Sequence, residues 1–219
     1  MREILHTVQI AASPLRRVSA LTRTQGNGEP VMVFPGILSS DKSTSLLRRT
    51  LDKAGYVALA SNLGFVTGVT PEAFARAEAE LHEAYAKYGK KVVLLGWSLG
   101  GIYARVLAQR YPQEVSTVVT MGTPFSGDRK ANNAWRLYNT LNDHTVDAPR
   151  VPGDPSIKPA VQTVAVWSAN DGVIAPECAR GSETERDVEI EVPFRHFAMG
   201  SDKRAIERIV AILAEQLPT

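Results

Sequence analysis

Short apolar runs alternate with amphipathic stretches along most of the chain. From residue 31 onward the runs are rich in β-branched residues, and the stretches between them carry apolar residues three or four positions apart. This alternation is typical of βαβ units and predicts an α/β fold with about six mainly parallel strands in a doubly wound sheet. The predicted strands are Val31–Phe34, Tyr56–Ala60, Lys91–Leu95, Val115–Met121, Val161–Trp167 and Asp187–Val192. The predicted helices are Lys42–Ala54, Pro71–Tyr88, Ser98–Arg110 and Asp202–Gln216, and Thr70 is the expected N-cap of the helix that Pro71 begins.

Two segments depart from this alternation. Residues 1–29 fit either an N-terminal helix or one edge strand, and their last part, from Gln25, is a turn-rich connection. Between Phe125 and Ala160, about 35 residues separate two predicted strands, where a few residues and one helix are usual. We expect residues 125–160 to form a cap inserted into a single domain of residues 1–219, with a helix near Asn132–Leu141.

Composition and charge exclude several classes of protein. The 219 residues are 44% hydrophobic and 22% charged, which is ordinary for one globular domain. The 25 basic residues nearly balance the 23 acidic ones, and neither sign forms the runs expected of a nucleic-acid-binding protein. Charged residues interrupt the first twelve positions, and no apolar stretch approaches the roughly 20 residues of a membrane span. We therefore expect a cytoplasmic protein with no membrane span. Cys178 is the single cysteine, and we expect it to be a packing residue.

The candidate nucleophile is Ser98. It is the centre of the sequence Gly96-Trp-Ser-Leu-Gly100, which follows an apolar strand and precedes an amphipathic helix. This context is the one required for a nucleophile elbow, a tight turn that presents a serine at the carboxyl edge of a sheet. Glycines flank the turn because a side chain at either position would collide with the neighbouring strand or helix.

A serine nucleophile needs a base and an orienting acid. Of the four histidines, only His196 follows the last predicted strand, where a loop can return over the elbow; His144, in the cap, is the alternative base. Asp171 follows the strand that ends at Trp167, so the chain order Ser, Asp, His is kept. Asp143 and Asp154, both in the cap, are the alternative acids.

The oxyanion of a tetrahedral intermediate needs fixed hydrogen-bond donors. We expect one to be the backbone N–H of Leu99, which directly follows the nucleophile. The second is expected from the loop after the first strand, at Ile37, because Gly36 allows the backbone to turn toward the site. No metal or other cofactor is implied, since no cluster of His, Asp and Glu has ligand spacing.

These motifs together resemble those of α/β-hydrolase lipases and esterases, especially small bacterial triacylglycerol-lipase-like carboxylesterases. The resemblance covers about residues 30–216 and rests on Gly96–Gly101, Val119–Phe125, Trp167–Val173 and Arg195–Gly200. The chain departs from the family pattern in three places: Pro35 precedes Gly36 where His is common, Trp97 precedes the nucleophile, and Phe125 follows Thr-Pro where His is usual. The first strands of the full fold also have no clear counterpart, which indicates a minimal version.

The resemblance implies hydrolysis of a small-molecule carboxylic ester through an acyl-enzyme. Phe34, Trp97, Phe125, Trp135 and Tyr138 are candidates for an apolar acyl pocket, with packing in the core as the alternative role of each. An acyltransferase, perhydrolase or thioesterase would use the same triad. A binding module or structural scaffold on a hydrolase fold is the non-enzymatic alternative. The sequence leaves the oligomeric state open.

Overall fold

One parallel sheet of six strands organises the part of the chain that the structure describes. The computed structural model describes residues 25–128, 130–131, 135–147, 150 and 153–217. The strands are β1 (Pro30–Phe34), β2 (Val57–Ala60), β3 (Val92–Trp97), β4 (Val115–Met121), β5 (Gln162–Trp167) and β6 (Val188–Glu191). Their order across the sheet is β2-β1-β3-β4-β5-β6, and every neighbouring pair is parallel. The predicted α/β class with six parallel strands is confirmed.

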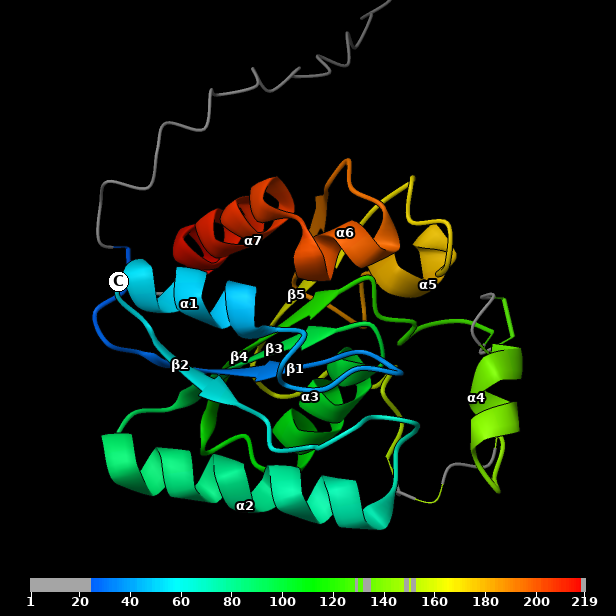
Figure 1. Cartoon of the computed structure of the whole chain (residues 1–219), viewed down its shortest axis with the longest axis horizontal. Coiled ribbons are helices and arrows are strands. Elements are labelled where there is room, and N and C mark those ends of the chain that lie inside the picture. The colour runs from blue at the N-terminus through cyan, green and yellow to red at the C-terminus, as the bar shows by residue number, and fades with distance from the viewer. Residues whose placement is uncertain (1–24, 129, 132–134, 148–149, 151–152, 218–219) are drawn as a thin grey trace, which may run out of the picture.

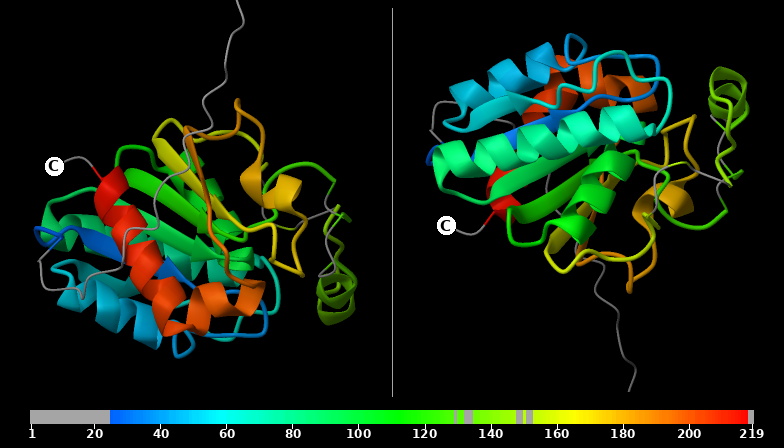
Figure 2. Two further views of the ribbon diagram at one scale, coloured as in Figure 1. Left: turned by 90° about the horizontal axis from the view of Figure 1, so that it is seen from above. Right: turned by 90° about the horizontal axis from the view of Figure 1, so that it is seen from below.

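Helices cover both faces of the sheet. Alternate strand residues point to opposite faces, so β1 and β3 supply Val31 and Val93 to one core and Met32 and Leu94 to the other. The first face is covered by α1 (Ser45–Lys53), α6 (His196–Ser201) and α7 (Lys203–Gln216), and the second by α2 (Pro71–Tyr88) and α3 (Leu99–Arg110). This three-layer arrangement is visible in Figures 1 and 2. It explains why the central strands are apolar without alternation, since both of their faces are buried.

The bounds of the predicted elements agree with the structure to within a few residues. The α2 helix begins and ends as predicted because Thr70 caps it, accepting a hydrogen bond from the Ala73 N–H at 3.2 Å, and Gly89 ends it in the left-handed conformation. The β3 strand continues two residues beyond the predicted Leu95, so Gly96 and Trp97 belong to the strand. Two short helices were not predicted, α5 (Pro176–Arg180) and α6. His196, which we expected on a loop, is the first residue of α6.

The segment predicted as a cap contains the helix α4 (Trp135–Leu141). This helix lies apart from the sheet, beyond the carboxyl ends of the strands (Figures 1 and 2). The helix was expected to start at Asn132, but residues 132–134 lie outside the described residues. The ambiguous segment 1–24 also lies outside them, and Gln25 and Gly26 each donate a backbone hydrogen bond to the carbonyl of Ala54.

Cys178 has the packing role that we expected of it. Its side chain is buried with Ile174 and Ala179 beside β5, and burial raises the pKa of its thiol. Among the described residues, no helix combines the length and apolar character needed to cross a bilayer.

Candidate active site

Ser98 lies in a sharp turn between β3 and α3. Its backbone angles, φ 53° and ψ −124°, are strained for a residue with a side chain, at a cost of about 1–3 kcal/mol. The turn is also crowded: a Cβ on Gly96 would lie 2.4 Å from Cα of Gly101, and one on Gly100 would lie 2.4 Å from the carbonyl oxygen of Phe34. Only glycine fits at these two positions, as the sequence predicts. The strain is retained because the strand and helix hold the turn from both sides.

Three side chains form a continuous line of hydrogen bonds at the carboxyl edge of the sheet. His196 Nε2 lies 3.0 Å from Oγ of Ser98, and Nδ1 of the same ring lies 2.9 Å from Oδ2 of Asp171. An ionised carboxylate accepts hydrogen bonds only, so Nδ1 carries the ring hydrogen and Nε2 is free to accept the Ser98 hydroxyl proton. All three residues are at most 5% exposed, so water competes little with these bonds.

The carboxylate of Asp171 is oriented by backbone groups. Its Oδ1 accepts hydrogen bonds from the N–H of Val173 at 3.0 Å and of Ile174 at 2.7 Å, which leaves Oδ2 for His196. The backbone N–H of His196 also donates to the carbonyl of Asp171 at 3.0 Å. The β5–α5 loop therefore fixes both the acid and the start of α6.

Gly122, directly after β4, is a residue of this site that our sequence reasoning did not single out. A Cβ here would lie 2.8 Å from Oδ2 of Asp171 and 3.1 Å from Nδ1 of His196. Its φ of 54° also favours glycine. The sequence did contain an indication of this role, because Gly122 belongs to the stretch Val119–Phe125 on which part of the family resemblance rests.

The loop after β1, which is the neighbour of β3 in the sheet, lies beside the nucleophile. A Cβ on Gly36 would lie 3.2 Å from Cβ of Ser98, so the backbone of this loop runs beside the serine. In the same loop, the N–H of Leu38 donates to the carbonyl of Val66 at 2.7 Å. Among the described groups, no acceptor is found for the N–H of Ile37 or of Leu99. Both N–H groups therefore remain available to an anionic oxygen.

The five predicted pocket residues lie in different surroundings. Trp97 packs beside the imidazole of His196, with ring centroids 5.8 Å apart, and its Nε1–H donates to the carbonyl of His196 at 3.2 Å. Phe34 is fully buried in the core under α2 and α3. Trp135, on α4, is half-buried and has the guanidinium of Arg136 5.3 Å from its ring.

Phe125 packs against a buried arginine. The guanidinium of Arg105, on α3, lies 4.0 Å from the ring centroid, and Arg105 is only 1% exposed. Burial lowers the pKa of Arg105 to about 10. The guanidinium donates to the backbone carbonyls of Pro155, Ser156, Ile157 and Glu185. Phe125 also lines a cavity of about 210 Å³ with Asp154 and Glu185, and the polar lining of this cavity differs from the apolar pocket that we predicted around Phe125.

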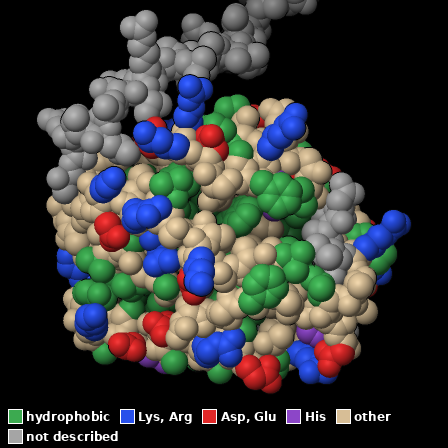
Figure 3. Space-filling model, viewed as in Figure 1, with side chains coloured by type: hydrophobic (Ala, Val, Ile, Leu, Met, Phe, Trp, Pro, Cys, Tyr) green, Lys and Arg blue, Asp and Glu red, His purple; other side chains and the backbone are tan. Residues whose placement is uncertain are grey.

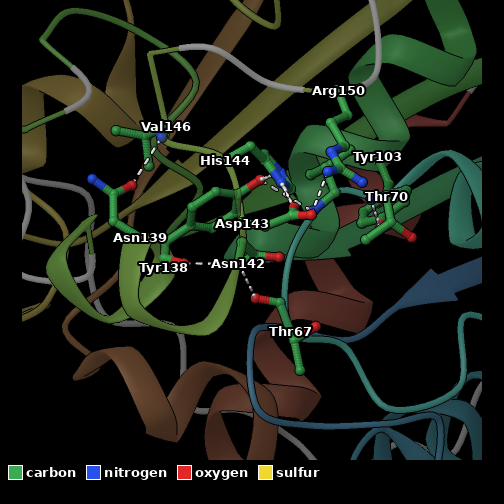
Figure 4. Close-up of polar contacts among 11 residues, drawn as sticks. Thr67, Thr70, Tyr103, Tyr138, Asn139, Asn142, Asp143, His144, Val146 and Arg150 are labelled. Carbon is green, nitrogen blue, oxygen red and sulfur yellow. Dashed lines mark hydrogen bonds and ion pairs between the residues drawn. The ribbon is translucent and has the colours of Figure 1, made fainter.

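Tyr138 and His144 join α4 to the loop before α2. The Tyr138 hydroxyl accepts from the N–H of Val69 at 3.2 Å and lies 3.0 Å from Nε2 of His144 (Figure 4). His144 Nδ1 lies 3.1 Å from Oδ1 of Asp143, which is ion-paired with Arg150. His144, the alternative base, thus belongs to a second His–Asp pair on the cap segment. The histidine that contacts Ser98 is His196.

The other alternative acid, Asp154, is engaged locally. Its Oδ1 accepts from the N–H of Ser156 at 3.0 Å and from the Ser156 hydroxyl at 2.8 Å. The carboxylate that reaches His196 is that of Asp171.

Comparisons with known proteins agree with this architecture. The family model described as alpha/beta hydrolase fold matches residues 34–157, more than half of the chain. No curated protein matches the sequence. The sequence identities to similar solved structures are low, so the similarity to them establishes the fold alone.

Three of these structures illustrate the similarity. A structure from work on LipS and LipT, two metagenome-derived lipolytic enzymes, has 15% identity and a TM-score of 0.60, over 87% of this chain and 95% of that chain. MGS-MChE2, an alpha/beta hydrolase enzyme from the metagenome of lagoon sediments of Mar Chica, Morocco, has 20% identity and a TM-score of 0.60, over 87% and 90%. The monoacylglycerol lipase of Paleococcus ferrophilus has 15% identity and a TM-score of 0.60, over 86% and 96%. The parallel sheet, its turn at Ser98 and the family match lead to one conclusion: this chain belongs to the alpha/beta hydrolase fold family.

Proposed function

We propose that this protein is a serine hydrolase that cleaves small-molecule carboxylic esters with Ser98 as nucleophile, His196 as base and Asp171 as orienting acid. The observation that carries the proposal is the line of hydrogen bonds from Ser98 through His196 to Asp171, with distances of 3.0 and 2.9 Å. A serine hydroxyl is a weak nucleophile at neutral pH, and this arrangement provides the base that activates it.

The reaction begins when His196 Nε2 takes the hydroxyl proton as Oγ of Ser98 attacks the ester carbonyl. Asp171 stabilises the resulting imidazolium. The tetrahedral intermediate then collapses, the bond to the alcohol oxygen breaks, and His196 gives its proton to the leaving alcohol. Water, deprotonated by the same histidine, then attacks the acyl-enzyme. The bond from the acyl carbon to Oγ of Ser98 breaks, His196 returns the proton to this oxygen, and the carboxylic acid leaves.

The negative oxygen of the intermediate is held by the backbone N–H groups of Leu99 and Ile37. Leu99 is the first residue of α3, where helix N–H groups lack partners within the helix. The approach of Gly36 to Ser98 supports the assignment to the loop after β1, and within this loop Leu38 already donates to Val66. Donors of this kind typically lower the barrier by about 2.7–4 kcal/mol each.

Residues 125–160 act as a cap over the site, and Trp97, Trp135 and Tyr138 form its apolar surroundings. Phe34 instead lies in the core, and Phe125 packs on Arg105. The position of α4 beyond the carboxyl edge of the sheet supports the cap (Figure 1). Of the five residues, Trp97 has the strongest support because it packs on His196.

A panel of p-nitrophenyl esters, measured with the wild type and with Ser98→Ala, tests the proposal. We expect turnover of at least one ester by the wild type and its loss in Ser98→Ala, together with labelling of Ser98 by a fluorophosphonate. Equal turnover by both proteins would contradict the proposal. So would a wild type that turns over no ester and is not labelled. Product analysis with a competing alcohol, with peroxide and with thioesters identifies the acyl acceptor, and we expect the free acid as main product.

A further inference from the structure

Exposed apolar side chains lie on the loops after β1 and β2 and on α6, beside the candidate site. Among the described large hydrophobic residues, Leu38, Phe65 and Phe197 are 46%, 65% and 67% exposed. The loops of Leu38 and Phe65 are tied together, because the N–H of Leu38 donates to Val66 and the N–H of Val66 donates to Ser39. Figure 3 shows hydrophobic side chains gathered on this face of the molecule. Single exposed apolar residues are ordinary, but a group at the rim of a catalytic site indicates contact with an apolar ligand.

Within this group, Phe197 is the residue whose ring contacts two rings of the candidate site. It follows His196 in α6, and its ring meets the imidazole edge-on, with centroids 5.6 Å apart and an interplanar angle of 87°. It also meets the indole of Trp97 at 6.4 Å and 75°. Trp97 is itself held by its hydrogen bond to the carbonyl of His196. Phe197 is therefore exposed to solvent on one side and supported by two rings of the site on the other.

The chemistry of the reaction places one part of the substrate beside this ring. The histidine that protonates the leaving alcohol must lie within about 3 Å of the alcohol oxygen. The group attached to that oxygen then extends from the imidazole, and Phe197 is the exposed apolar ring that packs on the imidazole. The acyl group, by contrast, is attached to the carbon that bonds to Ser98.

We propose that Phe197 is a specificity-determining residue that binds the alcohol part of the ester, and that the preferred substrates are esters of apolar, in particular aromatic, alcohols. This inference rests on the proposed function. An aromatic ring stacked on Phe197 gains buried apolar area and an aromatic pair contact. Together these raise kcat/KM for an ester of an aromatic alcohol about tenfold to hundredfold over that for an ester of a small alcohol.

Methyl acetate and benzyl acetate provide the test, because both give the same acetyl-enzyme and differ only in the alcohol. Both are used as true solutions, below their solubility limits. We expect the wild type to have a higher kcat/KM for benzyl acetate. In Phe197→Ala this value falls at least about tenfold, while kcat/KM for methyl acetate changes less than about threefold. Phe197→Leu, which keeps an apolar side chain, is expected to lie between the two.

The rate of deacylation shows whether Phe197→Ala acts by weakening the binding of the alcohol part or by disturbing His196. The alcohol has left before water attacks, so the steady-state rate after the burst with p-nitrophenyl acetate should be the same in Phe197→Ala and the wild type. Tyr85→Ala is the matched control, since Tyr85 is an exposed aromatic residue on α2, which packs on the opposite face of the sheet from α6; it should leave all rates unchanged.

Three outcomes would overturn the inference: an equal loss for both acetates, a slower deacylation step, or no change in Phe197→Ala. None of them would contradict the ester-hydrolase proposal, provided that the wild type turns over acetates and Ser98→Ala does not. Failure of the proposed function would instead appear as a wild type that is inactive on every ester.

Discussion

Gly122 lies so close to Asp171 that a Cβ atom on the glycine would come within 2.8 Å of the carboxylate oxygen Oδ2. That oxygen is the one that contacts His196. The end of β4 therefore leaves room for the hydrogen-bonded pair of Asp171 and His196, and the space exists only because residue 122 has no side chain.

Gly122→Ala should displace the carboxylate or the imidazole and lower kcat about 100-fold, as displacements of about 1 Å commonly do. Steady-state kinetics with a p-nitrophenyl ester measures the loss. Gly89→Ala is the matched control, because Gly89 has a similar φ of +60° but no atom within 4 Å of the added Cβ. It should cost about 1 kcal/mol of stability and leave kcat unchanged. Equal activity of the two variants would show that the contact at Gly122 is unimportant.

Asp171→Asn should lower kcat by about 10⁴-fold, the loss expected when the histidine is held in the wrong tautomer. The N–H groups of Val173 and Ile174 would keep the amide oxygen at the position of Oδ1, which turns the amide nitrogen toward His196. Nδ1 must then accept a hydrogen bond, so Nε2 carries the hydrogen and no longer accepts the serine proton.

The control for this variant is Asp143→Asn, which makes the same change at the second His–Asp pair. It should retain activity within about twofold, measured by the same assay. A loss in Asp143→Asn that equals the loss in Asp171→Asn would contradict the assignment of the acid.

Replacing the two histidines separates the base from its alternative. His196→Ala should abolish activity, with a loss of about 10⁴-fold or more in kcat. His144→Ala removes a contact of Tyr138 and should retain most activity, at a cost of about 1 kcal/mol in the free energy of unfolding. Kinetics and urea denaturation measure both effects, and the reverse pattern of activities would move the base to the cap.

Arg105→Met should lower the free energy of unfolding by about 2–4 kcal/mol, because backbone carbonyls of residues 155–157 and 185 lose their buried donor. Urea denaturation measures the change. Gln109→Ala removes two hydrogen bonds to the same segment, from Gln109 Nε2 to the carbonyls of Asp154 and Ile157, but at an exposed position. It should cost only about 1 kcal/mol. If both variants had equal stability, the buried position of Arg105 would have no energetic consequence.

The elements that the sequence predicted well carry their own local signals. The bounds of α2 follow from Thr70, Pro71 and Gly89, each of which acts through its own backbone or side chain. The helices α5 and α6 have only 5 and 6 residues, which is too few for a periodic apolar pattern to show.

The sequence by itself determined the α/β class, the tight turn at Ser98 and the chain order of Ser98, Asp171 and His196. These depend on steric preferences and on apolar periodicity within a few residues. The tertiary structure decided which groups meet. Examples are the contact of Gly122 with Asp171, the hydrogen bond of Arg105 to the carbonyl of Pro155, and the edge-on contact of the Phe197 ring with His196. The contacts of Gly122 with Asp171 and of Arg105 with Pro155 each join residues about 50 positions apart. The first forms because the parallel strands β4 and β5 place their carboxyl ends at one edge of the sheet. No local pattern in the chain encodes them, because they result from the packing of the whole sheet and its helices.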